Sequence, residues 1–269
     1  MTTKVKPKPQ QTKPNSWKRG AFLALSLAGG LALWALLARV LKLPAFILPG
    51  PGLVWERFLK SLASGQLIRH TLTTLFEVLS GLLLGSFFAT VLGYLLAKSP
   101  ALEKLVAPYL VASQSIPMVA IAPLLVIWFG PGIFSKVLIC ALIVFFPVLI
   151  NTVVGLREVP KDLSDLMRSL NATRTQTLWK LEVPAALPIF LGGLRVGATL
   201  SVIGAVVGEL VGADRGLGFL INVGRGQYDT ALVFVAVIAL IAMAMALYGI
   251  VLLIERRVLA WQSWRQDQI

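Results

Sequence analysis

The sequence predicts an all-α integral membrane protein with about six transmembrane helices, and three observations support this fold class. The 269 residues are 57% hydrophobic and 14% charged, and their mean hydropathy is +0.82. Apolar segments of about 20 residues, the length that crosses a bilayer, recur along the chain. The basic residues gather at the ends of these segments, as topology signals do, which argues against a nucleic-acid partner.

The chain begins with a basic stretch, residues 1–20, that is expected to be a flexible cytoplasmic tail. Residues 21–40 are longer than a signal-peptide core, so we expect an uncleaved first span, with cleavage near Ala38 as the alternative. A short surface helix is predicted over residues 53–63 of the outer loop that follows, with Trp55 at the membrane interface.

The second span is predicted over residues 71–97. It carries small residues at every fourth position, namely Gly81, Gly85, Ala89 and Gly93. A stripe of this kind lets another helix approach closely, so we expect tight helix packing here.

The third span, residues 105–129, contains Ser115, Pro117 and Pro123 at membrane depth. A proline frees backbone carbonyl groups, which are tolerated in a membrane where neighbouring protein or a watery cavity satisfies them. The segment therefore predicts either a simple kink or a break that lines a translocation path.

The fourth span is predicted over residues 136–155 and the fifth over 189–211. The fifth has close-packing glycines, and Arg195 near its inner end is expected to snorkel or pair. A glycine-rich outer loop is expected over 212–230.

The last span is predicted over residues 231–254, so that residues 21–258 form one membrane domain and 259–269 a cytoplasmic tail. The segments richest in basic residues then lie on one side of the membrane, which places both termini in the cytoplasm.

A polar segment, residues 157–188, separates the fourth and fifth spans. Four apolar residues recur at helical spacing within it, namely Leu163, Leu166, Met167 and Leu170. This spacing predicts an amphipathic helix with all four on one face. Such a stripe has to be buried against its own bundle, lipid headgroups or another protein.

Capping signals predict a hairpin of two helices in this segment. Asn171 can take the left-handed conformation that closes the first helix. Thr173 and Gln176 have the spacing of a capping box that opens the second, and Pro184 is expected to end it.

The same segment matches, by spacing, a signature of Glu-Ala-Ala, three residues, Gly, nine residues, Ile, one residue and Leu-Pro. The matching positions are Asp165-Leu166-Met167, Asn171, Leu181 and Val183-Pro184. The segment thus resembles the permease subunit of bacterial ABC importers, the binding-protein-dependent transport inner-membrane component family. Asn171 stands where the family has Gly, and Asn also tolerates the turn.

Further motifs extend the resemblance from Leu48 to Trp261 and favour the nitrate/sulfonate/taurine/bicarbonate-like branch. They are Ser115-Ile116-Pro117, Pro123, Trp128-Phe129-Gly130, Phe145-Phe146-Pro147, Pro184-Ala185-Ala186-Leu187-Pro188, Gly193-Leu194-Arg195 and Gly216-Leu217-Gly218.

The resemblance implies the type I ABC importer permease fold, in the bacterial inner membrane. It implies that the chain forms a homodimer with a second permease subunit. The other implied partners are two ATPase subunits that bind ATP and Mg²⁺, a substrate-binding protein on the outer side, and membrane lipid. The hairpin would be the coupling helix, with its contacts at Asp165, Leu166, Met167, Arg168, Leu170, Asn171, Leu181 and Pro184.

For the translocation pathway we expect Ser115, Pro117, Ser201 and Glu209. The two serines could instead bond to carbonyl groups of their own helices. Glu209 could instead face the outer water or pair with a nearby base.

No chemistry of catalysis is expected of this chain. It has no Gly-x-x-x-x-Gly-Lys-Ser/Thr loop for nucleotide phosphates. The chain has one His and one Cys, His70 and Cys140, which are too few for a metal site or a catalytic triad. We expect His70 to be a solvated loop residue and Cys140 to be a small buried hydrophobic residue.

The substrate implied by the resemblance is a small anion of the nitrate, sulfonate, taurine or bicarbonate type. A pyrimidine vitamin precursor or riboflavin is the alternative. An ion-coupled transporter or a channel would also have six spans, and it would need coupling carboxylates, for which Glu77 and Glu209 are the candidates. A membrane-bound enzyme would need more polar residues at the interfaces.

Overall fold

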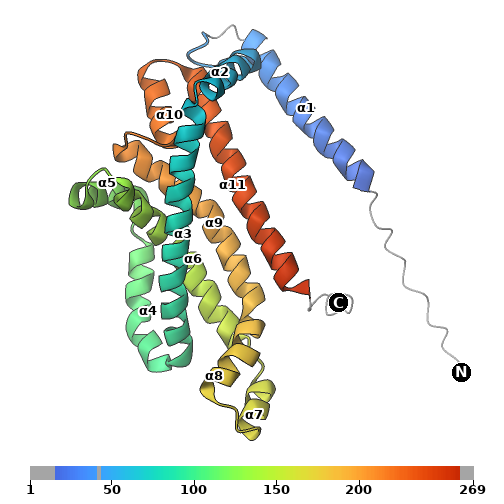
Figure 1. Ribbon diagram of the computed structural model, residues 1–269, viewed down its shortest axis with the longest axis vertical. Coiled ribbons are helices and arrows are strands. Elements are labelled where there is room, and N and C mark those ends of the chain that lie inside the picture. The colour runs from blue at the N-terminus through green and yellow to red at the C-terminus, as the bar shows by residue number, and fades with distance from the viewer. Residues whose placement is uncertain (1–15, 41–43, 261–269) are drawn as a thin grey trace, which may run out of the picture.

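The computed structural model describes residues 16–40 and 44–260, which form helices joined by short loops (Figure 1). In chain order the helices are α1 (Ser16–Val40), α2 (Pro51–Ala63), α3 (Gln66–Lys98), α4 (Pro100–Gln114), α5 (Met118–Phe129), α6 (Ile133–Arg157), α7 (Lys161–Ser169), α8 (Arg174–Thr177), the π-helix η1 (Leu178–Glu182), α9 (Val183–Gly212), α10 (Leu217–Gly226) and α11 (Thr230–Val258). Within these ranges there is no strand, so the predicted all-α class is confirmed.

The centre of the bundle is α6, which packs between α3 and α9. The small residues predicted to allow close packing make this contact. A Cβ added at Gly81 of α3 would lie 2.2 Å from Cβ of Cys140, and one added at Gly204 of α9 would lie 2.9 Å from Cα of the same residue. Side chains larger than hydrogen at these glycines would therefore push the helices apart.

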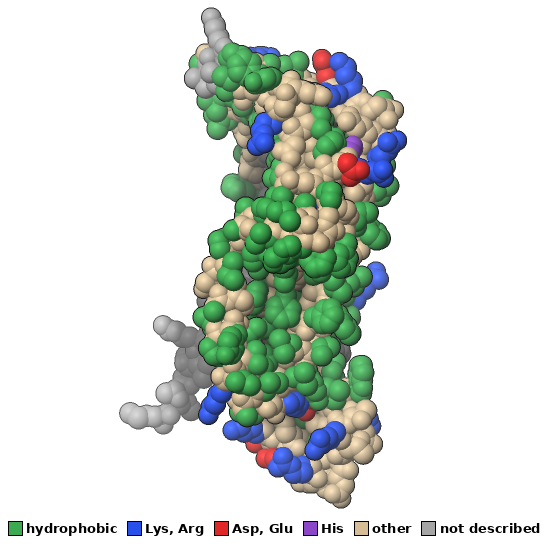
Figure 2. Space-filling model, turned by 90° about the vertical axis from the view of Figure 1, so that its left-hand side faces the viewer, with side chains coloured by type: hydrophobic (Ala, Val, Ile, Leu, Met, Phe, Trp, Pro, Cys, Tyr) green, Lys and Arg blue, Asp and Glu red, His purple; other side chains and the backbone are tan. Residues whose placement is uncertain are grey.

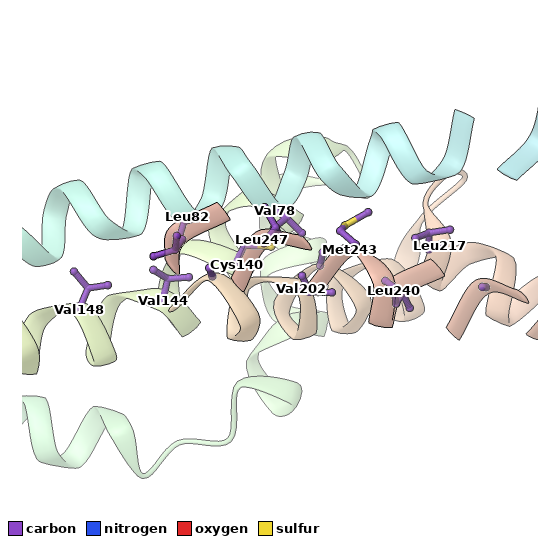
Figure 3. Close-up of a cluster of buried hydrophobic side chains, with 14 of the residues drawn as sticks. Val78, Leu82, Cys140, Val144, Val148, Val202, Leu217, Leu240, Met243 and Leu247 are labelled. Carbon is purple, nitrogen blue, oxygen red and sulfur yellow. The ribbon is translucent and has the colours of Figure 1, made fainter. Parts of the chain in front are cut away.

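Small and branched side chains fill the space between these helices (Figure 3). Val78, Val144 and Val202, one from each of α3, α6 and α9, are at most 4% exposed. Met243 and Leu247 of α11 join the same cluster. Because lipid tails are as apolar as these side chains, the bundle is held by close packing more than by exclusion of water.

Four described helices are long and apolar enough to cross a membrane, namely α3, α6, the continuous stretch Arg174–Gly212 and α11. The pair α4 and α5 passes the same test as a fifth span, although the two helices are bent by 93°. Within α1 the stretch Ala28–Val40 is a shorter apolar segment. The predicted count of six stays a prediction, whereas a multi-span bundle is confirmed.

The third span is broken, not kinked. Helix α4 ends at Gln114, and α5 starts at Met118 after an extended Pro117 with ψ 119°. Proline has no backbone N–H and disfavours helical geometry in the residue before it, so the helix cannot continue through Ile116. Of the two expected alternatives, a simple kink and a break, the structure shows a break.

The expected outer loop at residues 212–230 is wrong in its centre, where α10 forms. The loop folds because Leu217 and Leu220 are fully buried against the bundle. Gly216, with φ 109°, provides the backbone turn that starts the helix.

Several predicted boundaries shift. The surface helix α2 starts at Pro51, and α1 starts at Ser16, inside the predicted tail. Residues 1–15 and 261–269, which make up most of the two predicted tails, lie outside the described residues.

Hydrophobic side chains cover the middle of the visible face, whereas Lys and Arg side chains lie mainly toward its two ends (Figure 2). This is the surface expected of a protein that crosses a bilayer.

Candidate functional site

The polar segment between α6 and α9 forms a helical hairpin, which projects from the end of the molecule opposite to α2 and α10 (Figure 1). Its first arm is α7 and its second is α8. The hairpin is joined to α6 through Glu158 and Pro160, whose ψ of 132° is extended. The predicted pair of short helices is thus confirmed.

The turn between the arms is built as its capping residues predict. Asn171 has φ 52°, and its N–H donates to the Arg168 carbonyl at 3.0 Å. The Thr173 side chain accepts from the Gln176 N–H at 3.3 Å, while the Gln176 side chain accepts from the Thr173 N–H at 2.8 Å. This reciprocal pair of bonds is a capping box.

The apolar stripe of α7 is not packed against its own subunit. Leu166 is 52% exposed, Leu170 is 68% exposed and Leu163 is 42% exposed. Met167 is half-buried. A patch of large apolar side chains at the tip of a polar hairpin is typical of a surface that contacts another protein or the membrane.

Two charged residues lie beside this stripe. Arg168 and Asp165 form an ion pair at 3.6 Å, and both side chains are largely exposed. An exposed pair contributes little to folding, so both groups can contact a partner.

The base of the hairpin contains the π-helix η1. The Val183 N–H donates to the Leu178 carbonyl, five residues back, and Pro184 follows in the first turn of α9. The prediction that Pro184 ends the helix is wrong, because the wider turn accommodates a residue that has no N–H to donate. Leu181 is buried and Pro184 is half-buried, so these two predicted contacts anchor the hairpin and are set back from its tip.

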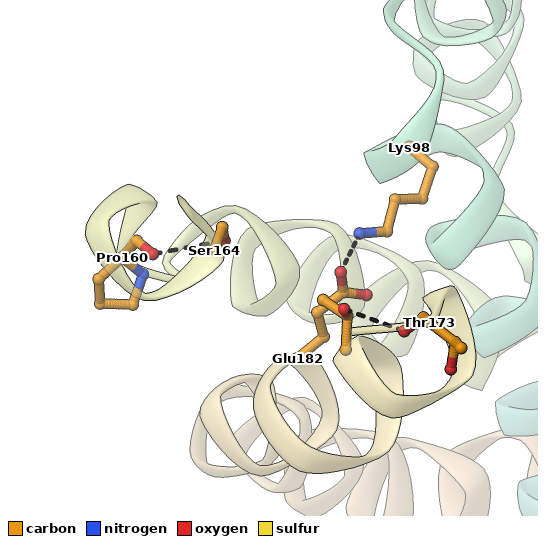
Figure 4. Close-up of polar contacts among 6 residues, drawn as sticks. Lys98, Pro160, Ser164, Thr173 and Glu182 are labelled. Atoms are coloured by element: carbon orange, nitrogen blue, oxygen red, sulfur yellow. Dashed lines mark hydrogen bonds and ion pairs between the residues drawn. The ribbon is translucent and has the colours of Figure 1, made fainter. Parts of the chain in front are cut away.

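Two ion pairs tie the hairpin base to the turn between α3 and α4. Lys98 Nζ lies 2.5 Å from Glu182 Oε1, and Glu182 is almost buried (Figure 4). Arg157, at the end of α6, pairs with Glu103 of α4. Movement of the hairpin base is therefore mechanically linked to the start of the broken pair α4 and α5.

A cavity of about 380 Å³ lies beside the same base. It is lined mainly by apolar side chains of α3, α6, η1 and α9, among them Tyr94, Leu95, Leu178, Trp179 and Phe190. Leu178 and Trp179 of η1 line this cavity, whereas Leu181 and Glu182 of the same turn are buried.

The four predicted pathway residues fall into two groups. Ser115 and Pro117 lie together at the break between α4 and α5, and both are exposed. The Ser115 hydroxyl donates to the Val111 carbonyl at 3.2 Å, which is the alternative role considered for it. Ser201 and Glu209 of α9 are fully buried within the subunit, so a pathway role for them has no support in the single chain.

Ser201 joins two helices. Its hydroxyl donates to the Val78 carbonyl of α3 at 2.9 Å, and the Cys140 thiol of α6 donates to its carbonyl at 3.4 Å. The bond to another helix was not among the roles expected from the sequence.

Glu209 holds the turn before α10. One carboxylate oxygen accepts from the Thr74 hydroxyl at 2.6 Å, and the other accepts from the Gly218 N–H at 2.5 Å. The alternative of facing outer water is wrong, because the side chain is 0% exposed.

His70 is not the solvated loop residue that we expected. It is 8% exposed on α3, and its Nδ1 accepts from the Gly216 N–H at 2.9 Å. The sequence analysis did not identify His70 or Thr74 as a partner of the Gly216-Leu217-Gly218 turn. The spacing of His70, Thr74 and Glu77, one helical turn apart, was the available signal.

The described residues contain no group of three or more His, Cys, Asp or Glu side chains that could hold a metal ion.

Comparison with known families gives one match over most of the chain. Residues 63–260 match the family described as "Binding-protein-dependent transport system inner membrane component".

Two relatives align over nearly the whole chain. The riboflavin transport system permease protein RibX of Chloroflexus aurantiacus is 44% identical over 97% of this chain and 97% of its own. The putative aliphatic sulfonates transport permease protein SsuC of Bacillus subtilis is 32% identical over 96% and 92%.

The fold is also similar to a solved one. A chain of the MetNI methionine ABC transporter, in an inward-facing conformation, superimposes with a TM-score of 0.61 at 20% identity. The match covers 71% of this chain and 95% of that chain, and it supports the permease fold alone.

Proposed function

The chain belongs to the binding-protein-dependent transport system inner membrane component family, and from this we infer that it moves a small solute across the bacterial inner membrane. It is the permease subunit of an ABC importer, a multi-pass protein that works with a separate ATPase subunit and a substrate-binding subunit. The chain supplies the path and the partner hydrolyses ATP.

The hairpin is the contact with the ATPase. The observation that carries this proposal is the apolar stripe at the polar end of the bundle, in which Leu163, Leu166 and Leu170 are exposed and Met167 is half-buried. An amphipathic helix of this kind fits an apolar groove of a partner, and Asp165 and Arg168 at its edge can fix the orientation. ATP and Mg²⁺ bind to that partner, and we propose no cofactor for this chain.

Motion passes from the hairpin into the bundle along two routes. One is the helix that continues from α8 through η1 into α9, which carries a displacement of the hairpin into a membrane span. The other is the ion pair of Lys98 with Glu182, which leads to α3 and α4. Both routes meet at η1, where the buried Leu181 and the ion-paired Glu182 hold the hairpin base to the bundle.

The assembly that we propose contains two copies of this chain and two ATPase subunits. The extracytoplasmic binding protein would dock at the end formed by α2 and α10, opposite to the hairpin (Figure 1). Both termini would lie on the hairpin side. The break at Ser115 and Pro117, where both residues are exposed, is the part of the pathway that this chain would contribute.

Two substrate classes fit the family. A small anion of the nitrate, sulfonate or taurine type is supported by the likeness to SsuC, and riboflavin by the higher identity to RibX. Uptake of labelled riboflavin and of labelled taurine by cells that express the whole importer separates the two. Uptake of neither would reject riboflavin and taurine themselves as substrates. Uptake driven by an ion gradient without the ATPase would favour an ion-coupled transporter.

The coupling role is tested by Leu166→Asp. A carboxylate in an apolar groove is strongly disfavoured, so this variant should lose the ATPase on purification and lower uptake by at least about 10-fold. The side chain is 52% exposed, so membrane insertion should be unchanged.

The matched control is Ser169→Asp, which adds the same charge to the same helix on an exposed position off the stripe. It should keep both the ATPase and transport. An ATPase that stays bound and coupled in Leu166→Asp, or equal losses in the two variants, would disprove the assignment.

A further inference from the structure

Two glutamates meet inside the bundle near its α2 and α10 end. Glu77 of α3 is 1% exposed and Glu209 of α9 is 0% exposed. Thr74, one helical turn before Glu77 on the same face of α3, bonds the Glu209 carboxylate at 2.6 Å, which brings Glu209 beside Glu77. Two adjacent carboxylates out of contact with water repel each other strongly, and one proton between them removes the repulsion.

The hydrogen bonds of Glu209 identify which of the two carries no proton. Both of its oxygens accept: Oε1 from Thr74 and Oε2 from the Gly218 N–H. The Thr74 hydroxyl itself accepts from the Leu217 N–H at 2.8 Å. Two acceptors lie within reach of its hydrogen, the His70 carbonyl at 3.2 Å and Glu209 Oε1 at 2.6 Å, and the shorter distance is that of a hydroxyl bound to an ionised carboxylate. Glu209 thus has the bonding pattern of a carboxylate.

Glu77 has the opposite pattern. Its Oε2 is buried and has no hydrogen-bond partner among the described residues. A buried ionised oxygen without a donor is costly, whereas a protonated acid needs an acceptor, which the neighbouring Glu209 provides.

The charges around the pair favour one proton. Lys136 of α6 is 2% exposed and packs against Gly208, the neighbour of Glu209, where an added Cβ would lie 2.9 Å from the Lys136 Cγ. Its Nζ donates to the Pro131 carbonyl. His70 accepts at Nδ1 from the Gly216 N–H. One lysine and two glutamates that share one proton sum to zero charge, which is the least costly state in a low-dielectric interior.

The remaining charges near the pair lie at the surface. Asp214 and Arg215, in the loop between α9 and α10, pair with each other at 3.5 Å and are largely exposed, so water screens them.

We propose that Glu77 and Glu209 form a buried proton-binding site, with Glu77 as the protonated acid and Glu209 as the carboxylate. The site fastens the Gly216-Leu217-Gly218 turn, and with it α10, to α3 and α9. A Cβ added at Gly216 would lie 2.1 Å from Glu209 Oε1, which shows how closely the turn encloses the carboxylate. The proton is part of the fold and is not transported.

Infrared spectroscopy of the intact importer tests the protonation. At neutral pH the wild type should have the C=O stretching band of a protonated carboxylic acid. Glu77→Gln should abolish this band, whereas Glu56→Gln, the same change at an exposed carboxyl of α2, should leave it intact. A wild type without the band, or a band that survives in Glu77→Gln, would overturn the proposal.

Thermal unfolding tests the assignment of roles. Glu77→Gln keeps a donor toward Glu209, so its Tm should stay within about 2 °C of the wild type. Glu209→Gln offers one acceptor oxygen to two donors and should lower Tm by about 3–10 °C. Equal losses, or a larger loss in Glu77→Gln, would contradict these roles, and stability that depends on Na⁺ would assign a metal cation in place of the proton.

Discussion

At the scale of single residues, the hairpin turn depends on Asn171. Its φ of 52° is a left-handed conformation, in which most side chains crowd the backbone. With this conformation the Asn171 and Ala172 N–H groups reach carbonyls of α7, both at 3.0 Å. The direction in which the second arm leaves the first is therefore set by one residue.

Replacement of Asn171 should follow backbone preference. Asn171→Gly should keep or slightly raise stability, whereas Asn171→Val should cost about 1–2 kcal/mol, because a β-branched side chain is strained at this φ. Because the strain falls on the hairpin, we expect Asn171→Val to reduce ATP-driven uptake more than it reduces Tm.

Uptake and thermal unfolding of the two variants, measured side by side, check this. If Asn171→Gly and Asn171→Val had the same Tm and the same uptake, the conformation of the turn would be set by its surroundings and not by residue 171.

At the scale of elements, contacts between helices are set by glycine. Along α3, a Cβ at Gly85 would lie 2.4 Å from the Ala141 carbonyl oxygen, and one at Gly93 would lie 2.8 Å from Thr152 Cβ. Because the first of these atoms belongs to the backbone of α6, it cannot rotate away. The helices have to separate if Gly85 gains a side chain.

The variant Gly85→Ala should therefore destabilise the bundle by about 1–3 kcal/mol. The control is Gly192→Ala on α9, where nothing lies within 4 Å of the added Cβ. It should be neutral or stabilising by up to about 1 kcal/mol, because alanine favours a helix over glycine. Thermal unfolding in detergent measures both, and a Gly85→Ala variant as stable as the control would refute the close contact.

At the same scale, the hairpin and the bundle differ in how they are held. The tip of α7 exposes apolar residues, whereas its base is fixed by the buried Leu181 and the ion pair of Glu182 with Lys98. A firm base below an exposed tip lets the hairpin move as one body. This arrangement suits an element that transmits displacement.

At the scale of the whole molecule, the two ends have different roles. The hairpin occupies one end, and α2 with α10 occupies the other (Figure 1). The proposed ATPase and binding-protein surfaces are thereby separated by the length of the membrane spans. Coupling between them has to pass through α3 and α9, which both reach the two ends.

This orientation can be tested with cysteine labelling. The natural Cys140 is fully buried and should not react, so new cysteines at exposed positions give a clean signal. In right-side-out vesicles an impermeant maleimide should label Gln227→Cys, after α10, and should label Thr175→Cys of the hairpin after permeabilisation. Labelling of Thr175→Cys in intact vesicles would reverse the topology and exclude the coupling role.

Local features were predictable from the sequence because they depend on residues close together in the chain. The membrane class follows from apolar segments of spanning length, and the hairpin from helical spacing with caps at Asn171 and Thr173. The glycine stripe of α3 predicted a close contact, and the contact is present. The identity of the helix that fills it was not predictable from the stripe.

By itself, the sequence determined a multi-span helical bundle with an amphipathic helical hairpin, because periodicity, capping and hydropathy act within a few turns of helix. Tertiary structure alone decided the burial of His70, Glu77 and Glu209, the 93° break between α4 and α5, and the π-turn that carries the chain past Pro184. Each of these depends on neighbours remote in the chain or on how strain at a proline is relieved. Thr74 and Glu209, 135 positions apart, share a hydrogen bond only because α3 and α9 pack side by side.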